Sequence, residues 1–281
     1  MSELHVREAG QGEPAVLLHG LFGNGANLGA LARSLQTDYH VISPDLPGHG
    51  RSPVPDAFDL PGMAEAVFAW LQSQVKGQVE GLVEGQGLER VHLVGHSLGG
   101  KVAMQMALSC PERVASLVVA DIAPVAYPPS HEAVFAGLQA VAAADCATRQ
   151  AAQAVLAQHV RDAQVVQFLL SSLRREGGGE GEGEVRYGWR FDHAAIQSAY
   201  PQLLAAPAGE LVYAGPVLFI KGGDSHYIDE AQRSVIEQRF PAASLRVMAD
   251  CGHWLHAEKP ELFNSTVRRF LSRHVISGHA I

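Results

Sequence analysis

The chain lacks any run of lysine and arginine that would form a basic patch. Its 21 lysines and arginines are outnumbered by 29 aspartates and glutamates, and the formal net charge is −8. Binding to nucleic acid or to an anionic membrane surface depends on clustered positive charge. We therefore expect no nucleic acid among the partners of this protein.

Long hydrophobic runs are also missing. No window approaches the roughly 18 consecutive apolar residues that a transmembrane helix needs. The first ten residues lack the basic head and apolar stretch that are typical of a signal peptide. We therefore expect no membrane span and a cytoplasmic location.

Cysteine is scarce in this chain. Cys110, Cys146 and Cys251 are odd in number and far apart in the sequence. This spacing fits neither a disulfide framework nor a set of metal ligands. We therefore expect a protein of a reducing compartment that holds no metal through cysteine.

Apolar residues are plentiful, at 47% of the 281 residues, whereas charged residues make up only 18%. This composition suits one large α/β domain that carries an insertion. Short apolar runs, such as residues 15–18 and 91–94, alternate with helix-like patterns, such as Leu28, Leu31 and Leu35. The alternation predicts a mostly parallel sheet with helices on both faces.

The alternation stops between residues 126 and 206. Apolar residues recur there at helical spacing, and no strand of the main sheet is evident. The sequence predicts a helical cap over residues 126–206, inserted after the sixth strand, and an α/β core of residues 1–125 and 207–281. Residues 76–87 and 176–184 are rich in glycine and glutamate, which favours tolerated surface insertions.

The motif Gly95-His96-Ser97-Leu98-Gly99 fits G-x-S-x-G and lies between an expected strand and an expected helix. This context is typical of a nucleophile elbow, in which a serine occupies a strained turn at the carboxyl edge of the sheet. Ser97 is therefore the expected nucleophile.

The turn also suggests an oxyanion hole, because the first N–H groups of a helix are free to bind a developing negative charge. The N–H group of Leu98 is one expected donor. The loop at residues 19–23, which follows the strand at 15–18, offers the N–H group of Leu21 as the second. Phe22 is the alternative donor from the same loop.

A serine hydroxyl needs an adjacent base to act as a nucleophile at neutral pH. Of the 14 histidines, His253 lies between the last expected strand, at residues 245–248, and the last expected helix. Its loop opens at the same edge of the sheet as Ser97. His253 is therefore the expected general base.

The chain resembles the α/β-hydrolase superfamily in the segments HGLFGNGANLGALA, PDLPGHGRSP, GHSLGG, DIAPVAY and GHWLHAEKP. More narrowly, it is similar to the YbfF-type esterases of bacteria and to their eukaryotic relative, abhydrolase domain-containing protein 11. The resemblance covers nearly the whole chain. It implies hydrolysis of carboxylic esters or acyl thioesters through an acyl-enzyme intermediate, with no metal or organic cofactor.

Two aspartates compete for the role of triad acid. Most superfamily members place this acid after the strand at residues 217–220, three residues past a glycine, and Ser225 occupies that position after Gly222. Asp224 lies one residue earlier. Asp121 lies in the segment DIAP, where the YbfF-type enzymes carry their acid. The resemblance therefore favours Asp121, and Asp224 remains the alternative.

Several aromatic and histidine side chains are expected to line the substrate pocket: Tyr127, His131, Phe135, Trp189, Tyr227 and Trp254. The expected substrate is a small acyl ester or thioester, and the protein is expected to be a monomer or a weak homo-oligomer. A C–C bond hydrolase or a perhydrolase would use the same triad. A non-catalytic receptor or scaffold is the alternative from another class, because a fold does not fix a function.

Overall fold

The structure, a computed structural model, describes residues 4–77, 90–177 and 185–276. A seven-stranded sheet runs through these ranges in the order β1-β3-β2-β4-β5-β8-β9. Only the β1–β3 pair is antiparallel, and every other neighbouring pair in this sheet is parallel. The strands are β1 (Val6–Ala9), β2 (Glu13–Leu18), β3 (Tyr39–Pro44), β4 (Val91–His96), β5 (Val114–Ala120), β8 (Val217–Gly222) and β9 (Ala243–Met248).

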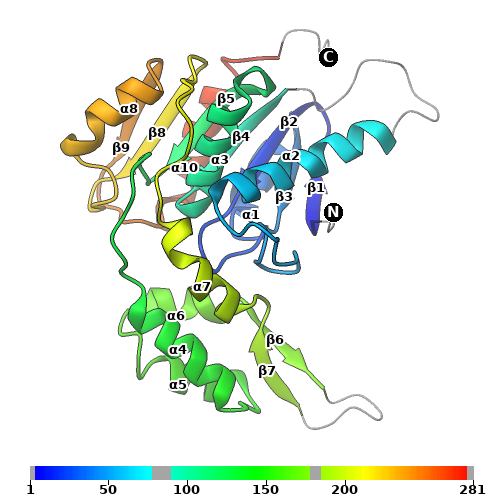
Figure 1. Ribbon diagram of the computed structural model, residues 1–281, viewed down its shortest axis with the longest axis vertical. Helices are drawn as coiled ribbons and strands as arrows, with labels where there is room; N and C mark the ends of the chain where they lie inside the picture. Colours follow the sequence, from blue (N-terminus) through cyan, green and yellow to red (C-terminus); the bar gives the residue numbers. More distant parts are fainter. Residues whose placement is uncertain (1–3, 78–89, 178–184, 277–281) are drawn as a thin grey trace.

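Helices cover both faces of the sheet, as the sequence predicts (Figure 1). The helices are α1 (Gly29–Leu35), α2 (Leu60–Gly77), α3 (Leu98–Ser109), α4 (Glu132–Ala143), α5 (Arg149–Leu156), α6 (Ala163–Leu170), α7 (His193–Leu203), α8 (Arg233–Arg239), α9 (Leu255–Glu258) and α10 (Pro260–Leu271). Two short 3-10 helices are η1 (Pro111–Arg113) and η2 (Glu230–Gln232). In the described part of the chain, no helix combines the length and the hydrophobicity needed to cross a bilayer.

The side chains of β2 show how the core is divided. Val16 and Leu18 belong to the buried cluster that includes α2 and α3, whereas Ala15 and Leu17 belong to the cluster with α1 and α10. Successive side chains of a strand point to opposite faces, so a parallel strand buried on both faces is apolar throughout. This arrangement explains the continuous apolar run at residues 15–18.

The segment between β5 and β8 forms a separate layer, drawn below the main sheet in Figure 1. It contains α4, α5, α6 and α7 together with an antiparallel hairpin of β6 (Leu173–Glu176) and β7 (Arg186–Trp189). The expectation of an all-helical segment is therefore wrong. The hairpin strands have four residues each, and each contains a single buried residue, so they carry no hydrophobic alternation that the sequence would reveal.

The position of the segment also differs from the prediction. It follows the fifth strand in chain order rather than the sixth, because β1, β2, β3 and β4 are the strands that precede β5 among the described residues. The division into a core and a cap stays a prediction. Residues 78–87 and 178–184 of the two glycine-rich stretches lie outside the described residues.

Candidate active site

Ser97 occupies a strained turn between β4 and α3. Its φ of 52° and ψ of −120° lie outside the regions that residues with a side chain prefer. The turn is held by two backbone hydrogen bonds, from the Ser97 N–H to the Ala120 carbonyl (3.0 Å) and from the Lys101 N–H to the Ser97 carbonyl (3.1 Å). This geometry presents the serine side chain to the cavity beside the sheet.

Two glycines allow the strand and the helix to approach closely at this turn. A Cβ atom on Gly95 would lie 2.2 Å from the Gly99 carbonyl oxygen. A Cβ atom on Gly99 would lie 2.2 Å from the carbonyl oxygen of Leu18. Side chains at these positions would force the backbone apart, so the spacing of the motif has a direct steric cause.

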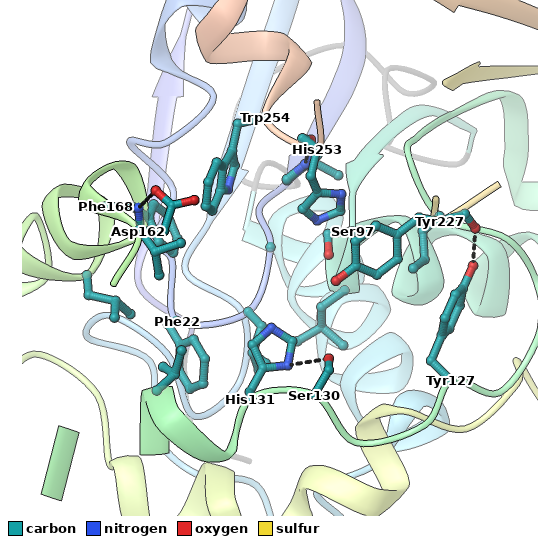
Figure 2. Close-up of a pocket in the computed structure, with 18 of the residues that line it drawn as sticks. Phe22, Ser97, Tyr127, Ser130, His131, Asp162, Phe168, Tyr227, His253 and Trp254 are labelled. Atoms are coloured by element: carbon teal, nitrogen blue, oxygen red, sulfur yellow. Dashed lines mark hydrogen bonds between the residues drawn. The ribbon is translucent and has the colours of Figure 1, made fainter. Parts of the chain in front are cut away.

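His253 lies beside Ser97, although the two residues are far apart in the sequence. Figure 2 shows the His253 imidazole next to the Ser97 hydroxyl. The Nδ1 atom of His253 is 2.8 Å from Oδ2 of Asp121, whose side chain is fully buried. The Nε2 atom of the same ring is thereby directed toward the serine. Loops at one edge of the sheet therefore bring Ser97, His253 and Asp121 together, in the sequence of contacts that a Ser-His-Asp triad requires.

The Asp121 carboxylate is held from several sides. The Gly222 N–H donates to Oδ1 over 2.9 Å, and the Ser225 hydroxyl donates to Oδ2. The backbone of Asp121 has a φ of 53°, and its N–H donates to the Ile220 carbonyl over 2.8 Å. A buried carboxylate needs such partners to remain in the interior. These hydrogen bonds also fix the orientation in which the carboxylate contacts His253.

Asp224, the alternative acid, is exposed. Its backbone N–H donates to the Cys251 carbonyl, and its carboxylate has no hydrogen bond to any described residue. The carboxylate bonded to His253 is therefore that of Asp121. Ser225, which sequence reasoning assigned no role, supplies a donor to this carboxylate. Its position three residues after Gly222 was the signal available in the sequence.

His253 is positioned by two further side chains. The ring of Tyr227 stacks on the imidazole with 4.1 Å between ring centroids. The Nε2 atom of His96 lies 2.8 Å from the His253 carbonyl oxygen and donates to it. Burial lowers the pKa of His96 well below its usual value, so this ring is neutral and keeps a single N–H.

The loop at residues 19–23 is fixed by His19. The Leu46 N–H donates to Nε2 of His19 over 2.9 Å, so the ring hydrogen is on Nδ1, which donates to the Gly20 carbonyl over 2.8 Å. Burial lowers the pKa of His19 to about 4, which keeps the ring neutral. The loop is also held by the Ser172 hydroxyl, which donates to the Phe22 carbonyl over 3.0 Å.

This loop leaves free N–H groups next to the serine. Within the described ranges, the N–H groups of Leu21 and Phe22 have no protein acceptor. The Leu98 N–H is free because it starts α3. All three residues line the cavity that contains Ser97. The structure therefore offers the expected pair of donors and also the alternative one.

The cavity has a volume of about 960 Å³ and lies between the sheet edge and the segment of residues 126–206. Four of the expected wall residues line it: Tyr127, His131, Tyr227 and Trp254. Within the described ranges, no three His, Cys, Asp or Glu side chains are arranged to hold a metal ion.

Phe135 and Trp189 were expected in this wall, but the structure places them behind it. Phe135 is buried and packs against Phe22 and Tyr200. Trp189 is buried in β7, and its indole N–H donates to the Leu138 carbonyl over 2.9 Å. Both rings fill the interior of the segment above the cavity. Aromatic residues at helical spacing are often core residues, and these two are examples.

Lys101 is a buried residue of α3 that sequence reasoning missed. Its ammonium group donates to the Val125 carbonyl (3.0 Å) and to the carbonyls of Leu204 and Ala205 (2.7 Å each). These carbonyls lie on the two chain segments that lead into and out of the layer of residues 126–206. Burial lowers the pKa of Lys101 to about 7. A lysine within the mostly apolar helix that follows Ser97 was the available signal.

Comparison with known proteins agrees with this architecture. A family model described as the alpha/beta hydrolase fold matches residues 14–260. Esterase YbfF of Escherichia coli (strain K12) is 37% identical over 263 residues, which cover 92% of this chain and 93% of that protein. The Mus musculus protein named sn-1-specific diacylglycerol lipase ABHD11 is 36% identical over 266 residues, covering 92% of this chain and 80% of that protein.

A solved structure described as a marine microorganism esterase superposes with a TM-score of 0.85. It is 32% identical, and the match covers 96% of this chain and all of that one. The resemblance that the motifs indicate is thereby confirmed. The chain belongs to the α/β-hydrolase fold family, and its similarity to these esterases and lipases identifies it as an esterase-type hydrolase.

Proposed function

We propose that this protein hydrolyses carboxylic esters or acyl thioesters through an acyl-enzyme intermediate. Ser97 is the nucleophile, His253 the general base and Asp121 the acid of the triad. The observation that carries the proposal is the Ser97 turn beside an imidazole whose Nδ1 is 2.8 Å from a fully buried carboxylate. The names of the relatives support ester cleavage over C–C bond cleavage or peracid formation.

In the first half of the reaction, His253 Nε2 takes the Ser97 proton as the hydroxyl oxygen attacks the acyl carbonyl carbon. The negative charge moves to the carbonyl oxygen, which accepts hydrogen bonds from the N–H groups of Leu98 and Leu21, or Phe22 in place of Leu21. The imidazolium is stabilised by Asp121, and it then protonates the leaving alcohol or thiol. Water repeats these steps on the acyl-serine ester and releases the acid.

The segment of residues 126–206 acts in this proposal as a cap that closes the cavity and limits acyl size. Tyr127, His131, Phe168 and Tyr200 from this segment line the cavity opposite the sheet edge. A volume of about 960 Å³ suits a ligand larger than an acetyl ester. The preferred substrates are therefore esters or thioesters with an extended acyl or alcohol part.

The proposal is tested at Ser97. A fluorophosphonate probe is expected to label Ser97, and Ser97→Ala is expected to lower kcat on 4-nitrophenyl butyrate by roughly 10⁶-fold, the scale for loss of a triad nucleophile. Ser265→Ala is the matched control, because Ser265 lies on α10 and, among the described residues, its hydroxyl bonds only the Leu262 carbonyl. Labelling of another residue, or near-normal turnover by Ser97→Ala, would contradict the proposal.

A further inference from the structure

His131 is placed across the cavity from the proposed catalytic pair. It precedes α4 and lines the cavity together with Ser97 and His253. Figure 2 shows its ring on the far side of the space from the His253 imidazole. The ring also packs edge-on against Phe22, with centroids 6.0 Å apart, so it borders the loop that offers the oxyanion donors.

The hydrogen bonds of Tyr200 favour one tautomer of His131. The Ser130 N–H donates to the Tyr200 hydroxyl oxygen over 3.3 Å, so this oxygen is already an acceptor. The hydroxyl hydrogen needs an acceptor of its own, because Tyr200 is buried. The Nδ1 atom of His131 contacts the hydroxyl and is placed to accept this hydrogen. The hydroxyl of Ser130 lies 3.4 Å from the same nitrogen.

A neutral imidazole carries one N–H, and an Nδ1 that accepts leaves this N–H on Nε2. Burial lowers the pKa of His131, and the nearby His253 lowers it further, so the ring is neutral at neutral pH. Its Nε2 has no hydrogen-bond partner among the described residues. The ring is partly exposed to the cavity, so this N–H faces the space that a substrate would fill.

We propose that the Nε2–H group of His131 donates a hydrogen bond to a substrate oxygen other than those of the ester or thioester that Ser97 attacks. This inference rests on the proposed function, since it concerns the substrate of the same site. An N–H that loses water to a ligand needs an acceptor on that ligand, and otherwise it opposes binding. The preferred substrates therefore carry an ether, hydroxyl or carbonyl oxygen in the acyl chain or in the alcohol part.

The tautomer can be measured without any substrate. With ¹⁵N-labelled histidine, the signals of His131 are assigned by their loss in His131→Gln. The expected result at about pH 7.5 is a neutral ring with the hydrogen on Nε2, which becomes a mixture of tautomers in Tyr200→Phe. A ring that carries the hydrogen on Nδ1, or one that is doubly protonated at this pH, would overturn the proposal.

The substrate preference is measured with a series of esters in which one oxygen replaces one CH₂ group at successive positions. One set varies the acyl chain and the other the alcohol part, so the two sources of the oxygen are distinguished. For at least one position, we expect the wild-type protein to prefer the oxygen-bearing ester over its CH₂ counterpart by about tenfold in kcat/KM, the scale of one hydrogen bond. Intrinsic reactivity of the esters cancels when the ratio is compared between variants.

Two variants separate the donor from the shape of His131. His131→Phe retains a ring against Phe22 but has no N–H, and the ratio is expected to fall to about one. His131→Gln carries an amide N–H near the place of Nε2, and the preference is expected to return in part. If the esters are hydrolysed but His131→Phe does not change the ratio of kcat/KM between the two esters, this inference is overturned and the proposed function stays intact. Absence of hydrolysis of every ester would overturn both.

Discussion

At the scale of single residues, the site depends on which carboxylate meets His253. Asp121 is fully buried and accepts from Gly222 and Ser225 as well as contacting His253 Nδ1. Asp224 is exposed and has no such partner among the described residues. A carboxylate placed like that of Asp121 fixes the imidazole tautomer and stabilises the imidazolium. A carboxylate placed like that of Asp224 does neither.

This contrast predicts a ranking of two isosteric variants. Asp121→Asn is expected to lower kcat on 4-nitrophenyl butyrate by about 10²- to 10⁴-fold, because an amide cannot stabilise the imidazolium. Asp224→Asn, the matched control, is expected to stay within about threefold of wild type. Circular dichroism and thermal unfolding should show that both variants are folded like the wild-type protein. The reverse ranking would contradict the assignment of Asp121.

A second residue-scale prediction concerns Ser225, which donates to Asp121 from the loop after β8. Ser225→Ala removes one donor but leaves the Gly222 N–H and His253 in contact with the carboxylate. We expect a loss in kcat of about tenfold, the scale of one hydrogen bond to a charged group. The measurement is steady-state hydrolysis compared with Ser265→Ala, whose hydroxyl is remote from the site. A loss as large as that of Asp121→Asn would show that Ser225 has a more direct role.

At the scale of elements, α3 is joined to both ends of the layer of residues 126–206. Its buried Lys101 donates to the Val125 carbonyl on one side and to the Leu204 and Ala205 carbonyls on the other. The same helix begins at the proposed nucleophile. The position of the proposed cap is therefore coupled to the nucleophile helix through one ammonium group.

We expect Lys101→Met to lower the free energy of unfolding by about 2–4 kcal/mol, because the hydrogen bonds from one buried ammonium group to three carbonyls are lost. Amide hydrogen exchange should rise at residues 125–127 and 204–205. Lys259→Met is the matched control, since Lys259 is partly exposed, donates to the Ala249 carbonyl and forms an exposed ion pair with Asp250 at 3.7 Å. The control should change the stability by at most about 1 kcal/mol. Equal effects of the two variants would contradict the coupling.

At the scale of the whole molecule, buried histidines make the stability dependent on pH. Burial lowers the pKa of His19 and His256 to about 4 and that of His49 to about 3. In the unfolded chain these groups take up protons below the ordinary histidine pKa of about 6.5. The unfolded state therefore binds more protons than the folded state between about pH 6.5 and pH 4, and stability is lost as the pH falls through this range.

The expected loss is about 1.4 kcal/mol per pH unit for each of these groups below pH 6. Urea unfolding at pH 7 and pH 5 measures it through the transition midpoint. His256→Phe removes one titrating ring that packs against His96 and Phe263, and the dependence on pH is expected to become shallower. An unfolding free energy that does not change between pH 7 and pH 5 would show that these rings take up protons as readily in the folded state as in the unfolded state, and it would contradict their lowered pKa values.

The amino-acid sequence by itself determined the features that depend on neighbours in the chain. The apolar run before Ser97, the glycines on either side of it and the helix after it define the turn, because their steric demands act within a few residues. The alternation of strands and helices determined the sheet in the same way. The loop position of His253, between the last strand and the last helix, could also be predicted.

Only the tertiary structure decided the features that depend on distant segments. The chain pattern left Asp121 and Asp224 as competitors, and the choice depends on how the loops after β5, β8 and β9 meet. The burial of Phe135 and Trp189 behind the cavity and the three contacts of Lys101 were likewise not evident from spacing. Spacing along a strand or helix determines which face a side chain occupies, but packing of other elements determines what lies against that face.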